Sequence, residues 1–181
     1  MELLSTIITG RSPAVQRLRT EEMNHGFVEE RMFSFSGEFT INATPLVYKL
    51  STVVPILLRE VAASVDSGAI SVKTYCHFMG TEGGVFDSVL DLNPLCFIQG
   101  LRSVSAVLKS GGTFTQTQNP GCVLRLRSSG ATAQANSLSD SNQHVRGLPS
   151  GDYYFVLTPL VSGDCTGTLR IIFEELDQWP S

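Results

Sequence analysis

Hydrophobic and polar residues alternate with a period of two along much of the chain after residue 26. At this spacing, alternate side chains fall on the same face of a β-strand. In residues 37–42, for example, Phe39 and Ile41 alternate with polar side chains. The alternation recurs in residues 69–78, 122–127 and 168–174. Each of these segments is therefore predicted to be a half-buried strand.

Turn-forming residues separate these segments. Clusters of Gly, Pro, Asp, Asn and Ser stand at residues 66–68, 80–84, 110–112, 119–121, 149–152 and 162–164. Short strands divided by such turns, without a long helical period between them, predict an all-β fold, an antiparallel β-sandwich or jelly roll. Residues 55–63 fit either a helix that begins at Pro55 or a strand, and the β-branched residues around Pro55 favour the strand.

The first part of the chain has a different character. In residues 12–22, Ser12 can cap a short helix, Pro13 suits its first position, and residues 24–26 supply a stop. We therefore predict an N-terminal arm with a short helix over residues 1–26 and one β-sandwich domain over residues 27–181. Residues 128–145 contain few large apolar side chains and are predicted to form a long exposed loop that can serve as a contact surface.

Composition narrows the class of protein. With 42% hydrophobic and 17% charged residues, the chain is expected to fold into a globular domain. A net charge of −4 and scattered basic residues do not favour nucleic acid as a partner, because phosphate binding requires clustered Lys and Arg. The start of the chain lacks the pattern of a secretory signal, and no apolar run is long enough to span a bilayer. We therefore expect a soluble protein made in the cytosol, with no membrane partner.

Cysteine and histidine give no sign of a metal or redox site. The cysteines are far apart and form no CxxC pair: Cys76, Cys96, Cys122 and Cys165. In a reducing cytosol they are expected to be small buried hydrophobes. The histidines are equally isolated: His25, His77 and His144. A Cys76–His77 nucleophile pair is not expected, because neighbours on a strand point to opposite faces.

Carboxylates and tyrosines offer weak candidates for chemistry. The acidic pairs are Glu29 with Glu30, Asp87 with Asp91, and Glu174 with Glu175, and adjacent acids are expected on solvated faces. Asp87 and Asp91, joined by Asp66 or Asp164, have the oxygen ligands but not the spacing of an EF-hand calcium site. Residues 80–84 lack the lysine of a phosphate-binding loop and are predicted to be a mobile turn. We predict no catalytic, cofactor-binding or metal-binding residues, and therefore no enzyme.

The order of segments carries a resemblance. A short arm leads into Phe33-Ser-Phe35 and residues 37–41, an apolar stretch ending at Val65 leads into residues 69–75, and the later segments are residues 147–155 and 167–175. This layout resembles the small β-sandwich virion proteins of tailed bacteriophages, of the capsid decoration or cement type. The resemblance covers roughly residues 27–175 and is a likeness of layout.

The resemblance implies a non-enzymatic virion protein, assembled in the cytoplasm of the host bacterium. Its implied partners are the major capsid protein or other virion proteins, and its implied state is a homo-oligomer, with a trimer favoured. Residues 1–26 and 136–144 are the expected contact segments. Two alternatives stay open. The first is another structural protein, either a tail or head-to-tail adaptor or a jelly-roll capsid subunit of a small virus, although the acidic residues of the arm do not favour packaging of nucleic acid. The second is a carbohydrate-binding module whose site would use Tyr75 or Tyr154.

Overall fold

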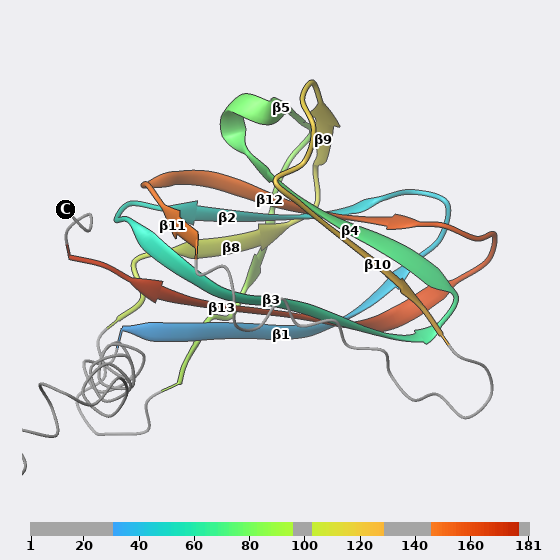
Figure 1. Ribbon diagram of the computed structural model, residues 1–181, viewed down its shortest axis with the longest axis horizontal. Helices are drawn as coiled ribbons and strands as arrows, with labels where there is room; N and C mark the ends of the chain where they lie inside the picture. The colour runs from blue at the N-terminus through green and yellow to red at the C-terminus, as the bar shows by residue number, and fades with distance from the viewer. Residues whose placement is uncertain (1–30, 96–102, 129–145, 178–181) are drawn as a thin grey trace, which may run out of the picture.

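The computed structural model describes residues 31–95, 103–128 and 146–177, which form two antiparallel β-sheets packed face to face (Figure 1). The predicted all-β antiparallel sandwich is therefore confirmed. The predicted arm and its short helix, the contact segment 136–144 and nearly all of the long loop 128–145 lie outside the described residues.

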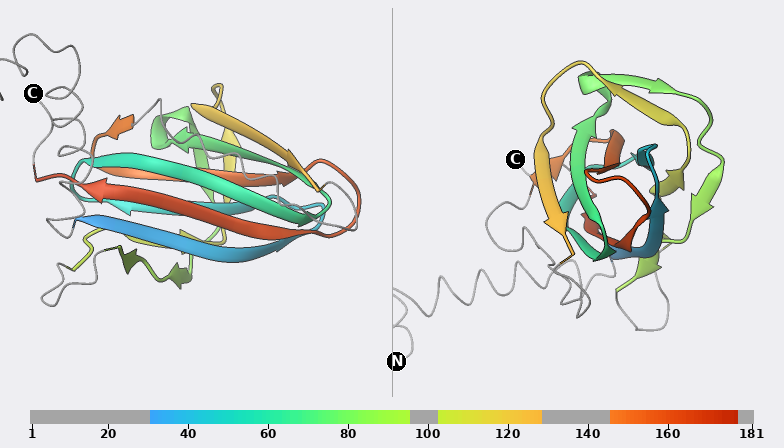
Figure 2. Two further views of the ribbon diagram at one scale, coloured as in Figure 1. Left: turned by 60° about the horizontal axis from the view of Figure 1, so that its bottom comes forward. Right: turned by 90° about the vertical axis from the view of Figure 1, so that its right-hand side faces the viewer.

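The five-stranded sheet has the order β11-β3-β13-β1-β7. Its strands are β1 (Met32–Ile41), β3 (Ile56–Ser67), β7 (Asn93–Pro94), β11 (Arg146–Leu148) and β13 (Cys165–Glu175). The long strand β13 lies between β1 and β3 and pairs antiparallel with both, and these three strands run side by side along the sandwich (Figure 2). Because β1 and β13 are antiparallel, the start of β1 and the end of β13 lie at the same end of the sandwich (Figure 1).

The six-stranded sheet has the order β10-β4-β12-β2-β8-β6. Its strands are β2 (Leu46–Thr52), β4 (Ala69–Cys76), β6 (Ser88–Leu90), β8 (Val107–Ser110), β10 (Cys122–Arg127) and β12 (Gly151–Pro159). A separate two-stranded ribbon, β5 (Gly80–Gly83) with β9 (Thr113–Gln116), stands on the outer face of this sheet (Figure 1).

The main core lies between the two sheets and is built from alternate residues of their strands. The rings of Phe33 and Phe173 are 5.9 Å apart within one sheet, and Phe155 is fully buried on the other. The other large apolar side chains that are almost fully buried here are Leu50, Ile56, Ile70, Leu108, Leu157, Leu169 and Ile171. Each side chain of this size stabilises the fold by about 1.5–3 kcal/mol relative to exposure, so this core is the main source of stability.

Three predictions about individual segments have different outcomes. The preference for a strand over residues 55–63 is confirmed by β3. The predicted strand over residues 69–78 is too long, since β4 ends at Cys76 and His77–Met79 form a single 3-10 turn. The turn begins there because the chain leaves the sheet to enter the β5–β9 ribbon. The mobile turn predicted for residues 80–84 is likewise wrong, because β5 pairs with β9 over four residues.

A second, smaller core lies between the six-stranded sheet and the ribbon. Its buried members are Val47, Tyr75, Phe86, Tyr154 and Val156. The ring of Phe114, from β9, stacks on Tyr154 with a centroid distance of 4.3 Å. Strand β4 is therefore buried on both faces along part of its length, because the ribbon covers Tyr75.

Cysteine and glycine meet at the turn between β3 and β4. Gly68 has a φ of +87°, which favours glycine, and a Cβ there would lie 2.5 Å from the Sγ of Cys165. Cys165 is fully buried, whereas Cys76 and Cys122 are half-buried. The prediction of a small buried hydrophobe is therefore confirmed for Cys165, and Cys96 lies outside the described residues.

Candidate functional site

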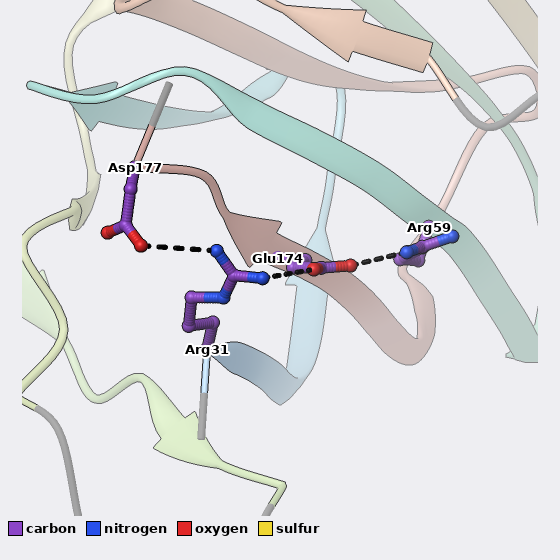
Figure 3. Close-up of polar contacts among 4 residues, drawn as sticks. All are labelled: Arg31, Arg59, Glu174 and Asp177. Atoms are coloured by element: carbon purple, nitrogen blue, oxygen red, sulfur yellow. Dashed lines mark hydrogen bonds and ion pairs between the residues drawn. The ribbon is translucent and has the colours of Figure 1, made fainter. Parts of the chain in front are cut away.

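The first described residue, Arg31, is held firmly where the chain enters the sandwich. Its carbonyl oxygen accepts a hydrogen bond of 2.9 Å from the backbone N–H of Glu175 at the end of β13. Its guanidinium lies between two carboxylates (Figure 3): Nη2 is 3.6 Å from Oε1 of Glu174, and Nη1 is 3.3 Å from Oδ2 of Asp177. Both the backbone and the side chain of Arg31 are thus attached to the last strand.

Glu174 bridges this arginine to a second one. Arg59 donates from Nε to Oε2 of Glu174 at 3.2 Å, and its Nη2 forms a shorter bond to the same oxygen (Figure 3). The Glu174 side chain is only 4% exposed, so its charge has little access to water. A carboxylate in this position requires charged partners to offset its desolvation, and the two guanidinium groups supply them.

A β-bulge in β3 brings Arg59 to this place. The register pairs Ile172 with Glu60 and Phe173 with Leu58, so Arg59 is an extra residue without an opposite partner on β13. A bulge of this kind bends the strand and redirects a side chain. We call Arg31, Arg59, Glu174 and Asp177 the entry anchor, because they fix the point at which the preceding residues join the sandwich.

Glu175 faces the opposite way from Glu174, into the end of the main core. Its side chain is fully buried, and its Oε1 accepts hydrogen bonds from the backbone N–H and hydroxyl of Ser105, at 2.9 and 2.8 Å, and from the N–H of Ala106, at 2.8 Å. These residues lead into β8, so Glu175 joins the five-stranded sheet to the six-stranded one. The prediction that these adjacent glutamates lie on a solvated face is wrong, because distant residues supply partners for both.

The two glutamates do not form a catalytic carboxylate pair. Successive residues of a strand point to opposite faces, and here one carboxylate is outside the five-stranded sheet and the other inside the sandwich. A glycosidase requires both carboxylates on either side of one bond. The contacts of Glu174 and Glu175 therefore indicate a structural role, which is to hold together the end of the sandwich at which the chain enters.

A shallow hollow of about 330 Å³ lies on the outer face of the five-stranded sheet, farther along from the entry anchor. Its lining consists of Ser36, Glu60, Ala62, Ala63, Ser64, Thr168 and Arg170. In the register, Arg170 of β13 lies between Ser36 of β1 and Ala62 of β3. The hollow exists because the side chains around Arg170 are short, and we call this surface the sheet hollow.

The tyrosines that could have formed a sugar-binding platform are in the interior. Each is only 2–3% exposed: Tyr48, Tyr75, Tyr153 and Tyr154. Tyr153 and Phe155 both belong to the main core. Tyr75 and Tyr154 serve instead as the floor beneath the β5–β9 ribbon, so they cannot stack on a sugar.

No family model, no curated protein and no solved structure matches this chain. The likeness to phage decoration proteins accordingly stays a prediction from the order of the segments. Among residues 31–95, 103–128 and 146–177, no three His, Cys, Asp or Glu side chains are grouped as metal ligands. In the same ranges no helix is long and apolar enough to cross a membrane.

The remaining chemical candidates are dispersed. His77 is exposed at the 3-10 turn and packs edge-on against Phe78, whereas Cys76 packs against the main core. Cys76 and His77 were predicted to point to opposite faces because they are neighbours on one strand. This reason is wrong, because β4 ends between them. Asp164 accepts a hydrogen bond of 2.8 Å from the side chain of Asn42, which gives this acid a role in tying two turns together.

An ion cluster ties the ribbon to the six-stranded sheet. Nζ of Lys49 lies 2.5 Å from Oε2 of Glu82 and 3.2 Å from Oδ2 of Asp152, and the Tyr154 hydroxyl donates to Glu82 at 2.6 Å. The hydrogen bonds from Lys49 and then Tyr154 lower the pKa of Glu82. Burial lowers the pKa of Lys49, but its bonds to Glu82 and Asp152 outweigh this and raise it overall. We call these four residues the ribbon clamp.

The pKa shifts predict how the ribbon clamp responds to pH. A carboxyl with a lowered pKa stabilises the fold above its ordinary value of 4.5 and loses this effect as the pH falls through the folded pKa. Lys49, with a raised pKa, stabilises below 10.5 and loses its effect at higher pH. The clamp should therefore be complete between these limits.

Substitution of Glu82 by Gln tests this clamp. Because Glu82 is partly exposed, Glu82→Gln should lower the free energy of unfolding by only about 0.5–1 kcal/mol at pH 7. Urea unfolding from pH 3 to pH 8 should show the difference from the wild type shrink toward zero at the acidic end. A difference that is independent of pH would contradict the assignment.

Proposed function

We propose that this chain is a structural protein that binds other proteins in a virus particle, as a decoration or cement protein on the head of a tailed bacteriophage. Its partner is the major capsid protein, and it is assembled in the bacterial cytoplasm. The observation that carries the proposal is the entry anchor, at which residues 1–30 join the sandwich through buried charge pairs.

The entry anchor suits a protein whose arm holds a partner. An arm transmits a load to its domain only if the residue that joins the two is fixed. Arg31 is held at the end of β13 by a backbone hydrogen bond and by ion pairs. Strand β13 is in turn paired with both β1 and β3, so a load on the arm is distributed over the whole five-stranded sheet. A cement protein needs this property because it spreads its hold over a large area.

The chemistry of the anchor also favours a positioning role. Buried ion pairs are weak contributors to stability, since apolar replacements of similar volume are often neutral or stabilising. Their best-attested use is to fix one arrangement among several. At the entry point, that arrangement is the direction in which residues 1–30 leave the sandwich. The choice of a phage head as the particle rests on the order of segments, which resembles that of decoration proteins.

Binding to heads tests this proposal. Heads assembled from the major capsid protein of the same virus, without this chain, should sediment with added full-length chain and saturate at a fixed ratio of copies to capsid protein. A chain lacking residues 1–26 should bind at least tenfold more weakly. Full-length chain that remains in the supernatant at all concentrations would overturn the capsid assignment.

A further inference from the structure

Two opposite charges border the sheet hollow, and neither is neutralised within the described part of the chain. Glu60 of β3 is half-buried and Arg170 of β13 is exposed, and no hydrogen bond or ion pair joins the side chain of either to another described residue. The register makes them diagonal neighbours on one face, since Glu60 lies opposite Ile172 and Arg170 lies opposite Ala62. This face therefore presents a carboxylate and a guanidinium side by side.

We propose that the sheet hollow is an interface between two copies of this chain, in which Glu60 of each copy pairs with Arg170 of the other. The argument is charge complementarity, because a surface that carries both signs next to each other complements itself across a two-fold axis. The inference rests on the proposed role in assembly and names one of its contacts.

The register allows the pairing. In the proposed dimer the two sheets face each other, and the two-fold axis lies midway between them, perpendicular to the strands, at a point between Arg170 and Ile172. Rotation about this axis places the row of residues that contains Arg170 in one copy opposite the row that contains Ile172 in the other. Glu60 of one copy then falls in the same row as Arg170 of the other, one strand away, or about 5 Å. Long side chains span this distance.

The side chains around the charges permit the approach. Ser36, Ala62, Ser64 and Thr168 are small, so two such faces can pack at about the 10 Å that separates stacked sheets. Glu60 and Arg170, the longer side chains, then extend into the hollow of the opposite copy. This arrangement satisfies both charges while the short residues keep the backbones close.

The size of the face predicts a weak contact. Residues 34–40 of β1 and their neighbours on β13 and β3 cover about 20 Å by 14 Å, or roughly 300 Å² per copy. A stable interface buries about 800 Å² per partner, so the free chain should dimerise only at high micromolar concentration or above. On a particle that holds many copies, the local concentration makes such a contact effective.

Charge-reversal variants of the full chain test the interface by sedimentation equilibrium. Glu60→Arg and Arg170→Glu should each weaken dimerisation at least tenfold, because like charges then face each other. An equimolar mixture of the two variants should form a mixed dimer, because each introduced charge now meets its opposite. Asp87→Arg and Arg125→Glu are matched controls, since both residues are exposed, Arg125 belongs to the six-stranded sheet and Asp87 is the residue before its strand β6, and they should dimerise like the wild type.

The outcomes separate this inference from the proposed function. Circular dichroism should show that all variants are folded, since Glu60 and Arg170 have no partner to lose within the described residues. Single variants that dimerise like the wild type, or a mixture that stays monomeric, would overturn the two-copy interface. A wild-type chain that is monomeric at every concentration and still binds heads would overturn the interface alone.

Discussion

Replacement of Glu175 by alanine is expected to lower the free energy of unfolding by about 2–4 kcal/mol. The substitution removes the acceptor of three hydrogen bonds, and the buried N–H of Ala106 is left without a partner. An unsatisfied buried donor carries its full desolvation cost, about 1–3 kcal/mol, while the donors of the more exposed Ser105 can turn to water. Urea or thermal unfolding measures the loss.

Ser105→Ala is the matched control for Glu175. This variant removes one hydroxyl donor and leaves both backbone donors in place, so the loss should be about 1 kcal/mol. If Glu175→Ala unfolds within 0.5 kcal/mol of the wild type, Glu175 does not join the two sheets in the way that its contacts indicate.

Replacement of Glu174 by alanine is expected to cost about 2–3 kcal/mol, somewhat less than the 3–5 kcal/mol lost when a fully buried ion pair loses one partner. The reason is that Arg31 and Arg59 lose the carboxylate between them, although their side chains, 11% and 18% exposed, retain some contact with water. The conservative Glu174→Gln retains an acceptor for Arg59 and should lose about half as much.

Asp177 provides the control for the entry anchor. Its side chain is 62% exposed, so Asp177→Ala should change the stability by less than about 0.5 kcal/mol. A double-mutant cycle between Glu174→Ala and Arg59→Ala should show strong coupling, because two donors of Arg59 bond to the same oxygen of Glu174. Additive losses would contradict the assignment of a single connected cluster.

The alternation of residues predicted the sheets well where one face of a strand is covered. Strand β10 occupies residues 122–127 as predicted, and Phe39, Ile41 and Leu169 are buried on the apolar side of their strands. A period of two is decisive there because a shift of one residue would expose a whole row of apolar side chains. The fold class and these faces therefore follow from local sequence.

Most of the features that the local sequence did not predict depend on contacts between residues far apart along the chain. Tyr75 and Tyr154 are covered by Phe114, which is 39 residues from one and 40 from the other along the chain, and no local pattern indicates such a cover. Arg59 reaches Glu174 through a β-bulge across 115 positions. Neither pairing has a local signature in a single sequence.

One signal for a buried carboxylate at the end of β13 was nonetheless present. Glu175 continues the alternate row of Leu169, Ile171 and Phe173, all of which are buried, so its position in the row indicated a buried carboxylate. A buried carboxylate needs partners, and the row therefore marked the end of β13 as a special position. Adjacent acids at the end of an apolar row should be considered separately from those on solvated faces.

The mass of the chain in solution, with and without residues 1–26, tests the central claim most directly. Light scattering on the full chain should give a concentration-dependent oligomer, with a trimer favoured, and the chain that begins at residue 27 should lose most of that association while it keeps its β-sheet circular dichroism spectrum. A full chain that neither associates nor binds heads, or an oligomer that is indifferent to removal of the arm, would contradict assembly through an arm attached at Arg31.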